Sequence, residues 1–370
     1  MDNENKRAVS WRRVALISIL VALIAICVLV VTNMGRSETP GSKPPAAPGD
    51  ILTSWNDCEA RNAFISYIES VTKKDSPDYI PVEDRIAVFD LDGTLFCETD
   101  PGYFDHMLFY HRVTEDPGYK DKATEEEKRV AGVVKGYFDT RKYPSGLDVD
   151  HGKGVATAFA GMTMEEFYAY IKEFREEPAN GYTGMKKGEA FYKPMLEIIS
   201  CLQANDFTVY VVSGTDRFIV RGLLKDSELN LPANNIIGSD SSLTATGQNG
   251  KDGMEYVFTD SDKVVMGGEF FIKNLKMNKV TVIMQEIGKQ PVLSFGNSSG
   301  DASMAKYVTK DNKYKSMAFM LCCDDLVREN GNTEAAEKMV KLCSENGWQA
   351  VSMKNDWKTI YKEGVTRKQT

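Results

Sequence analysis

Two carboxylates, Asp90 and Asp92, stand one residue apart in the stretch FDLDGTLF, directly after the apolar run 86–89. A buried strand that ends in two acidic side chains presents them at the end of a sheet, where α/β enzymes hold their sites. Because strand side chains alternate between faces, both carboxylates reach one ligand only if the chain leaves strand geometry at this point. Gly93 permits that turn at little steric cost. The spacing therefore predicts a reactive or cation-binding centre at a strand end.

Calcium-binding EF-hand loops share the D-x-D-G pattern, so they are an alternative for this stretch. Such a loop needs an oxygen ligand at its fifth position and a Glu at its twelfth, and here Thr94 and Pro101 stand there. The mismatch disfavours calcium. A plain structural turn is a second alternative, but two carboxylates this close repel each other unless a cation or a proton lies between them. We therefore expect Mg²⁺ or a similar cation.

Polar residues follow two further strand-like runs in the same way. One apolar run is followed by Ser213 and Gly214, and a later one by GNSSGD, which contains Asn297 and Asp301. The carboxyl ends of parallel strands meet at one edge of a sheet, so these residues can lie in one crevice with the first two carboxylates. The same pattern thus occurs after three strands, and together the three predict one site built from several strand ends more strongly than any single spacing does.

Strands and helices alternate along most of the chain. Such alternation predicts an α/β fold with a largely parallel, Rossmann-like doubly wound sheet. The tight-turn sequence GQNGKDG predicts a hairpin over 243–258. Periodicity and punctuation predict helices at 55–72, 279–287 and 333–346, and strands at 86–89, 207–212, 236–237, 291–295, 317–321 and 350–353.

Residues 98–190 differ from the rest in being rich in aromatic residues and short amphipathic stretches. We expect a mostly helical insertion there, which divides a catalytic core into 51–97 and 191–370. The aromatic side chains either pack the interior of this lobe, which is the simpler interpretation, or form a cage for a quaternary ammonium group. His106, His111 and His151 are too scattered in the sequence to form a metal site, and no role is assigned to them.

The N-terminus predicts a membrane anchor. Basic residues in a short tail, 1–13, precede an apolar segment at 14–32 that is long enough to span a bilayer. Positive charge before the span predicts that the tail is cytoplasmic and that the bulk of the chain lies outside the membrane. A cleaved signal peptide is disfavoured, because no small-x-small cleavage site closes the run. Residues 33–50, rich in Gly, Pro and Ser, predict a flexible linker.

Composition excludes some classes of function. A net charge of −8 over 370 residues, with no basic stripe beyond the N-terminus, argues against nucleic-acid binding. Disulfides and free thiols both stay open for the cysteines after the apolar segment, because their spacing matches no metal or disulfide framework. These are Cys58, Cys97, Cys201, Cys322, Cys323 and Cys343.

Four segments together resemble the haloacid dehalogenase superfamily, and within it the Mg²⁺-dependent phosphatases. They are FDLDGTLF, VVSGT at 211–215, a basic residue before a helix, and FGNSSGD at 295–301. The likeness runs from about residue 55 to 361. DGTLFCE and GWQAVSMKNDW are similar to segments of bacterial nonspecific acid phosphatases, and the layout more distantly resembles phosphorylcholine phosphatase. The resemblance implies a Rossmann-like core with a helical cap at 98–190.

The resemblance implies roles for the first two carboxylates. Asp90 would attack phosphorus and form an aspartyl phosphate, which divides one difficult hydrolysis into two transfers. Asp92 would protonate the leaving oxygen and then deprotonate the attacking water. Dehalogenases have no leaving alkoxide and lack this second acid, so Asp92 favours phosphoryl transfer.

The resemblance also implies residues that bind the phosphoryl group. Ser213 and Gly214, at the start of a helix, would bind its oxygens, although Ser213 is also explained as a helix cap. A lysine just before the helix that leads into the last segment would neutralise the phosphoryl charge. Lys279 fits this place, with Lys276 and then Lys273 as competitors.

Mg²⁺ is the implied cofactor. Its expected ligands are Asp90, the backbone carbonyl of Asp92, Asn297 and Asp301, although many relatives have Asp rather than Asn at the third position, and an amide brings an oxygen without charge. The sequence thus predicts Mg²⁺-dependent hydrolysis of small phosphomonoesters outside the membrane. A weak or inactive phosphate-ester binding protein and a phosphotransferase are the alternatives.

Overall fold

The computed structural model describes residues 47–368. The predicted cytoplasmic tail, the membrane anchor at 14–32 and nearly all of the linker at 33–50 lie outside these residues. Within 47–368, no helix is both long enough and apolar enough to cross a membrane.

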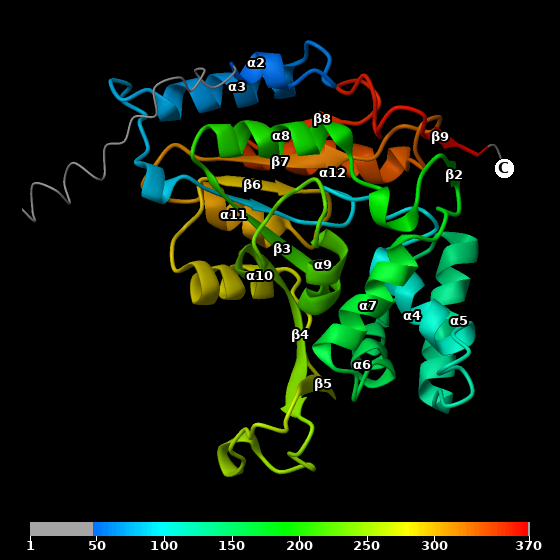
Figure 1. Cartoon of the computed structure of the whole chain (residues 1–370). Coiled ribbons are helices and arrows are strands. Elements are labelled where there is room, and N and C mark those ends of the chain that lie inside the picture. Colours follow the sequence, from blue (N-terminus) through cyan, green and yellow to red (C-terminus); the bar gives the residue numbers. More distant parts are fainter. Residues whose placement is uncertain (1–46, 369–370) are drawn as a thin grey trace, which may run out of the picture. The chain divides into compact units, whose positions relative to one another are not determined.

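A seven-stranded sheet forms the centre of the described part (Figure 1). Its strands follow the order β5-β4-β3-β1-β6-β7-β8, and every neighbouring pair is parallel except β4 and β5. The predicted α/β class with a largely parallel sheet is confirmed. The strands are β1 (Ile86–Phe89), β3 (Thr208–Asp216), β4 (Ile236–Ala245), β5 (Val264–Ile272), β6 (Leu293–Gly296), β7 (Met317–Cys322) and β8 (Gln349–Ser352).

Helices cover both faces of the sheet. Phe89 of β1 packs in the large core cluster with α3 and α8, whereas Val88 packs on the opposite face with α10 and α11. Figure 1 shows α3 and α8 above the sheet and α10 and α11 below it. The helices of the core are α2 (Pro48–Ile51), α3 (Glu59–Thr72), α8 (Lys193–Ala204), α9 (Arg217–Leu224), α10 (Met277–Val282, continued by a π-helical turn, Ile283–Ile287), α11 (Ala302–Thr309) and α12 (Thr333–Asn346).

An aromatic column joins three neighbouring strands, two of which, β1 and β6, lead into predicted site residues. Phe89, Phe295 and Phe319 lie side by side on β1, β6 and β7, with ring centroids 4.3 and 5.0 Å apart and nearly parallel planes. All three rings are buried. Phe89 directly precedes Asp90, so this packing fixes the place where the first carboxylate leaves the sheet.

The predicted helix at 55–72 begins later than expected, at Glu59. The side chain of Cys58 accepts a hydrogen bond from the backbone of Arg61 and caps the helix. Ahead of the cap, Trp55 forms an isolated β-bridge with Trp357 near the other end of the chain. A tertiary contact therefore competes with the helical pattern in this segment.

The hairpin predicted over 243–258 is wrong in its second strand. β4 pairs with β5, which begins only at Val264, and residues 246–263 form the loop between them. Asp262 closes this loop, because its carboxylate accepts hydrogen bonds from the backbone of Gly247 and Thr259. Side-chain bonding across the loop, rather than the tight-turn sequence, therefore sets the place where the chain returns to the sheet.

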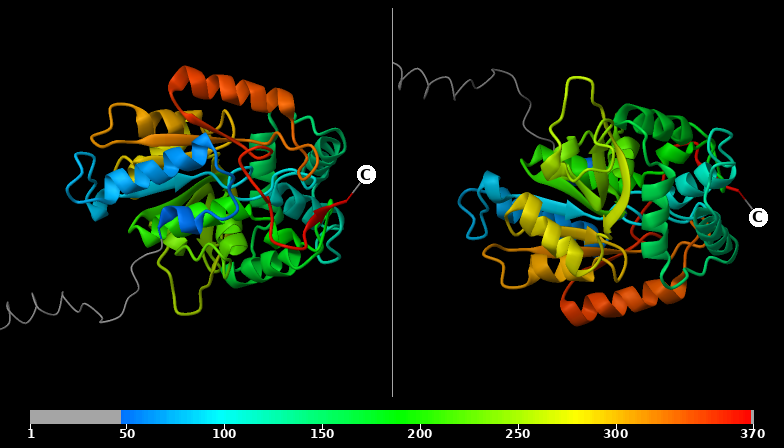
Figure 2. Two further views of the ribbon diagram at one scale, coloured as in Figure 1. Left: turned by 90° about the horizontal axis from the view of Figure 1, so that it is seen from above. Right: turned by 90° about the horizontal axis from the view of Figure 1, so that it is seen from below.

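Four helices make up most of the segment 98–190, and both views of Figure 2 show them gathered at one end of the sheet. Phe104, Phe159 and Phe167 are fully buried among them, as packing of a helical lobe requires. The helices are α4 (Phe104–Thr114), α5 (Glu125–Thr140), α6 (Leu147–Ala158) and α7 (Met164–Arg175). The segment then returns through the short strand β2 (Tyr182–Thr183), which pairs with β9 (Thr366–Arg367).

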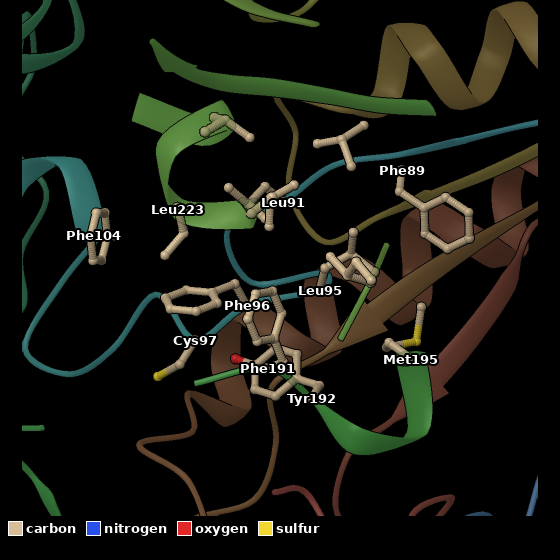
Figure 3. Packing of buried hydrophobic residues seen from close by; sticks show 14 of the residues in the cluster. Phe89, Leu91, Leu95, Phe96, Cys97, Phe104, Phe191, Tyr192, Met195 and Leu223 are labelled. Carbon is tan, nitrogen blue, oxygen red and sulfur yellow. The ribbon is translucent and has the colours of Figure 1, made fainter. Parts of the chain in front are cut away.

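The chain leaves and re-enters the core at adjacent points. Backbone hydrogen bonds join Cys97 to Ala190 and Tyr192 to Leu95, each 2.9 Å long. Figure 3 shows the buried side chains around this crossing, where the rings of Phe96 and Phe191 meet edge to face at 4.9 Å. The crossing therefore ties the helical segment to the strand end that carries Asp90 and Asp92.

Candidate active site

A cavity of about 300 Å³ lies at the carboxyl ends of β1, β3 and β6 and against α4. It brings together residues from all three of the strand ends that the sequence analysis singled out. Among the predicted site residues, Asp90, Asp92, Gly214, Asn297 and Asp301 line it. The other lining residues are Glu98, Tyr103, Asp105, His106, Tyr143, Asp148, Thr215, Lys273, Leu275, Lys276, Ser298, Ser299 and Gly300.

Lys279 occupies the place predicted for the positive charge. Its Nζ lies 2.5 Å from Asp90 Oδ1 and 2.6 Å from Asp301 Oδ1, and its side chain is fully buried. Burial alone would lower the pKa of Lys279, but the two carboxylates raise it above the usual value. Lys276 and Lys273 line the cavity and form no ion pair with any residue in 47–368. The geometry therefore favours Lys279 over both competitors.

Asp90 is placed to be a nucleophile whose charge depends on its neighbours. Burial raises its pKa to about 7, and the negative charge of Asp301 acts in the same direction, while Lys279 opposes both. Its backbone N–H donates to Phe295 O at 2.9 Å, continuing the pairing of β1 and β6 by one residue. The carboxylate is thus held at the strand end, beside the only cation that contacts it in the described part of the chain.

Asp92 has a different environment. Its Oδ2 accepts a hydrogen bond from Thr215 Oγ1 at 2.9 Å, whereas Oδ1 is buried and finds no partner among the described residues. Burial, followed by the charges of Asp105 and Asp90, holds its pKa well above the usual range. No lysine in the described part of the chain forms an ion pair with it. Asp92 therefore favours the protonated form, as a general acid must.

Backbone amides and a neighbouring carboxylate hold the third strand end. Asp301 Oδ2 accepts hydrogen bonds from the backbone N–H groups of Asn297 and Ser298 at 3.1 and 3.0 Å. Asn297 Nδ2 donates to Glu98 Oε1 at 3.0 Å. Burial raises the pKa of Glu98 to about 7, and the charge of Asp90 adds to this effect. Glu98 is a site residue whose contact with Asn297 the sequence did not predict.

The residues present fit a hard divalent cation. Carboxylates of Asp90 and Asp301, the amide oxygen of Asn297 and the backbone carbonyl of Asp92 are all oxygen donors, which Mg²⁺ prefers. Asp90 and Asp301 share the single buried ammonium group of Lys279, so the charged groups that meet here among the described residues carry more negative than positive charge. A bound Mg²⁺ would supply the missing charge.

Ser213 lies deeper than predicted. Its side chain is fully buried, its Oγ accepts a hydrogen bond from the backbone N–H of Thr215 at 3.0 Å, and it is not among the residues that line the cavity. β3 continues through this residue, so Gly214 and Thr215 reach the cavity in its place. A phosphate-binding role for Ser213 stays a prediction. VVSGT contained Thr215, but nothing in the spacing indicated its hydrogen bond to Asp92.

The expectation that the histidines are scattered is wrong for two of them. His106 and His151 stack face to face with ring centroids 3.9 Å apart, and His106 Nδ1 lies 2.8 Å from Asp105 Oδ1. The two rings come from α4 and α6, so only the packing of these helices brings them together. Asp105 and His106 line the cavity, whereas His111 lies apart, hydrogen-bonded to Tyr170.

The six cysteines in the described residues are free thiols. Of the two possibilities that their spacing left open, the structure has the reduced one.

Comparisons with known proteins identify the family of this chain. The family model for haloacid dehalogenase-like hydrolases matches residues 87–306, which is more than half of the chain. No protein of curated function matches the sequence. Similar solved structures include a conserved protein of unknown function from Anaerococcus prevotii, with 16% identity over 86% of this chain and 99% of that chain and a TM-score of 0.50.

Two further structures have lower TM-scores. A cytosolic 5'-nucleotidase IIIB bound to cytidine has 13% identity over 84% of this chain and 92% of its own, with a TM-score of 0.47. A phosphoserine phosphohydrolase-like protein from Francisella tularensis has 12% identity over 72% and 94%, with a TM-score of 0.38. The match of the family model carries the assignment and confirms the resemblance in the sequence: the chain belongs to the haloacid dehalogenase-like hydrolases.

Proposed function

We propose that the protein is a Mg²⁺-dependent phosphomonoesterase that works through an aspartyl phosphate on Asp90. The observation that carries this proposal is the different setting of two neighbouring carboxylates. Asp90 contacts the buried ammonium of Lys279 at 2.5 Å, whereas the one hydrogen-bond partner of the Asp92 carboxyl within 47–368 is the hydroxyl of Thr215, at 2.9 Å. One acid is stabilised as an anion and the other as a proton donor, as attack on phosphorus with departure of an alcohol requires.

The first step transfers the phosphoryl group to the protein. Asp90 attacks phosphorus, the bond between phosphorus and the ester oxygen breaks, and Asp92 gives its proton to the departing alkoxide, so that a neutral alcohol leaves. Lys279 stabilises the charge on Asp90 before attack and that of the phosphoryl oxygens afterwards. A Mg²⁺ held by Asp90, Asn297 and Asp301 would neutralise further negative charge at the same place.

The second step returns Asp90 to its starting state. Asp92, now ionised, takes a proton from a water molecule as the water attacks phosphorus, and the acyl phosphate bond breaks to give inorganic phosphate. The same side chain acts as acid and then as base, so its proton is restored at the end of the cycle. Thr215 holds this carboxyl through the two steps.

An acid in the place of Asp92 also favours esters over haloacids. Loss of a halide ion needs no proton, whereas loss of an alkoxide is greatly assisted by one. A second buried carboxyl beside the nucleophile would be costly and without use in a dehalogenase. The pair therefore supports phosphoryl transfer as the reaction.

We further propose that this activity lies outside the cytoplasmic membrane. The support is the basic tail followed by the apolar segment 14–32. Protease treatment of intact cells should remove the catalytic part, and its survival under conditions that digest a known external protein would contradict the location without affecting the proposed reaction.

Phosphate release from p-nitrophenyl phosphate tests the reaction. We expect turnover with Mg²⁺, loss of turnover with EDTA and recovery on adding Mg²⁺. Asp90→Asn is nearly isosteric and should lower kcat by at least about a thousandfold. Asp301→Ala should abolish the dependence on Mg²⁺ together with most activity.

Two results would overturn the proposal. Unchanged turnover by Asp90→Asn would exclude the nucleophile. Tight binding of phosphate esters by a wild-type protein that never releases phosphate would instead indicate a binding protein. A panel of phosphomonoesters, with Asp90→Asn as the blank, would then define the alcohol that the cavity accepts.

A further inference from the structure

The side-chain amide of Asn297 is held at both ends. Its Nδ2 donates to Glu98 Oε1 at 3.0 Å, and its Oδ1 accepts a hydrogen bond from Thr94 Oγ1 at 3.3 Å. An amide has distinct donor and acceptor ends, so a carboxylate on one side decides which atom points to the other. With Nδ2 directed at Glu98, Oδ1 is the end of the amide that remains to act as an acceptor in the cavity, which Asp90 and Asp301 also line.

The turn after Asp92 makes room for this pair. Gly93 has a φ of +75°, and a Cβ at this position would lie 1.9 Å from Asn297 Nδ2 and 2.6 Å from Glu98 Cδ. Any other residue would both strain the backbone and displace the hydrogen bond. Gly93 therefore serves the contact between Glu98 and Asn297 as well as the turn itself.

Hydrogen bonds hold both of the residues that flank Glu98 in the sequence. Glu329 is fully buried, and its Oε1 accepts hydrogen bonds from Thr99 Oγ1 at 2.6 Å and from Tyr182 OH at 2.5 Å. On the other side of Glu98, the backbone N–H of Cys97 donates to Ala190 O at 2.9 Å. Both neighbours of Glu98 are thus anchored, which distinguishes it from a solvated surface acid.

We propose that Glu98 is a positioning residue that orients the Asn297 amide so that its oxygen serves as a ligand for the catalytic cation. The inference rests on the proposed function, because it concerns the metal of that site. It also explains why an amide suits position 297 in this chain: an aspartate there would place a second carboxylate about 3 Å from Glu98, where the two would repel each other and no hydrogen bond could form without an added proton.

An exchange of the two groups tests this pairing. Glu98→Gln keeps an acceptor oxygen for Asn297, so its effect should be small. Asn297→Asp sets two carboxylates against each other. The double variant Glu98→Gln/Asn297→Asp restores a hydrogen bond with donor and acceptor exchanged, and it has the same net charge as the wild type. Glu98→Ala removes the acceptor altogether.

Mg²⁺ binding to EDTA-treated full-length protein, measured by isothermal titration calorimetry, gives a readout that needs no turnover. We expect Glu98→Ala to weaken binding by about tenfold or more and Glu98→Gln to change it by no more than about threefold. In the Asn297→Asp background, Glu98→Gln should instead strengthen binding by about tenfold. In assays of phosphate release, each of these variants should change the Mg²⁺ concentration needed for half-maximal activity by a larger factor than it changes kcat.

The alternative is a purely electrostatic effect of Glu98, and it predicts a change in Mg²⁺ affinity of the opposite sign in the Asn297→Asp background. If Glu98 acts only through its distant negative charge, Glu98→Gln weakens Mg²⁺ binding in both backgrounds by the same factor, and Asn297→Asp alone binds Mg²⁺ more tightly than the wild type. Either result overturns the inference. Thermal unfolding of each metal-free variant separates these effects from loss of fold.

The outcomes also separate this inference from the proposed function. A wild-type protein that binds no Mg²⁺ would remove both. A wild-type protein that binds Mg²⁺ and hydrolyses esters, but shows no coupling between positions 98 and 297, would remove the positioning role alone.

Discussion

Lys279 Nζ lies 2.5 Å from Asp90 Oδ1, although 189 residues separate them in the chain. The same nitrogen lies 2.6 Å from Asp301 Oδ1, so one buried ammonium group joins the ends of β1 and β6. This contact makes the strength of the nucleophile and the stability of the core depend on a single side chain.

Lys279→Met should therefore impair both properties. Removing the cation leaves two buried carboxylates unpaired, which costs about 3–5 kcal/mol of unfolding free energy and leaves phosphoryl charge without its partner. Urea unfolding and phosphate release measure the two losses. Lys276→Met is the matched control, since Lys276 is exposed and forms no ion pair in the described residues, and its unfolding free energy should change by less than about 0.5 kcal/mol. Equal stability of the two variants would contradict the assignment of Lys279.

Thr215→Val should change the pH dependence of the reaction. The hydroxyl of Thr215 lowers the pKa of Asp92, against the stronger effect of burial, by donating to its carboxylate. Without this bond the acid holds its proton to higher pH, so the alkaline limb of the kcat profile should move upward while the maximum falls by about tenfold. Thr215→Ser keeps the hydroxyl and should keep the profile. A profile that is the same for the valine variant and the wild type would show that Asp92 is not the acid.

The Asp216→Asn substitution should increase the unfolding free energy, relative to the wild type, by a larger amount as the pH rises. Burial raises the pKa of Asp216 to about 6, although hydrogen bonds from Ser241 and the backbone N–H of Phe218 oppose it. The folded state thus holds this proton more tightly than the unfolded chain, so the stability it contributes is full below about pH 4 and is lost as the pH rises through about 6. Asparagine keeps the helix cap without the charge.

Relative to the wild type, Asp216→Asn should gain about 2–3 kcal/mol of unfolding free energy between pH 4 and pH 8. Urea unfolding at the two pH values measures this gain. Asp75→Asn, at an exposed site, is the control and should show the same difference at both. A gain for Asp216→Asn that does not change with pH would exclude a buried, ionising carboxyl at this position.

Phe295→Ala should show that the aromatic column supports the site. The ring of Phe295 stacks on both Phe89 and Phe319, and its removal opens a cavity between three central strands. We expect a loss of about 3–5 kcal/mol by urea unfolding, together with lower activity at temperatures where the variant is still folded. Phe295→Leu fills more of the space and should lose clearly less. Full activity with unchanged stability would mean that the column does not position Asp90.

Much of the fold could be predicted from the sequence because its signals are local. The apolar runs before Asp90 and Asn297 and the alternation of strand and helix predicted a mostly parallel sheet, and the family match agrees with it. The local sequence patterns predicted element boundaries wrongly where contacts between distant segments of the chain compete with them. The start of α3 and the second strand of the hairpin depend on Trp357 and Asp262, which no local pattern reveals.

The residue types at the candidate site were likewise predictable, but their partners were not. The sequence could place Asp90, Asp92, Asn297 and Asp301 at strand ends, because a strand that ends in acids is a local feature. Whether Lys279 or a neighbouring lysine meets them depends on where a short helix starts and how it packs.

The sequence by itself determined the chemistry that is possible here: two carboxylates for transfer and acid–base work, oxygen ligands for a cation and a lysine near the last segment. The tertiary structure alone decided which atoms meet. It turned Ser213 inward, brought Thr215 to Asp92 and Glu98 to Asn297, and stacked His106 on His151. Side-chain orientation at a sheet edge depends on strand register and helix packing, and these are properties of distant segments acting together.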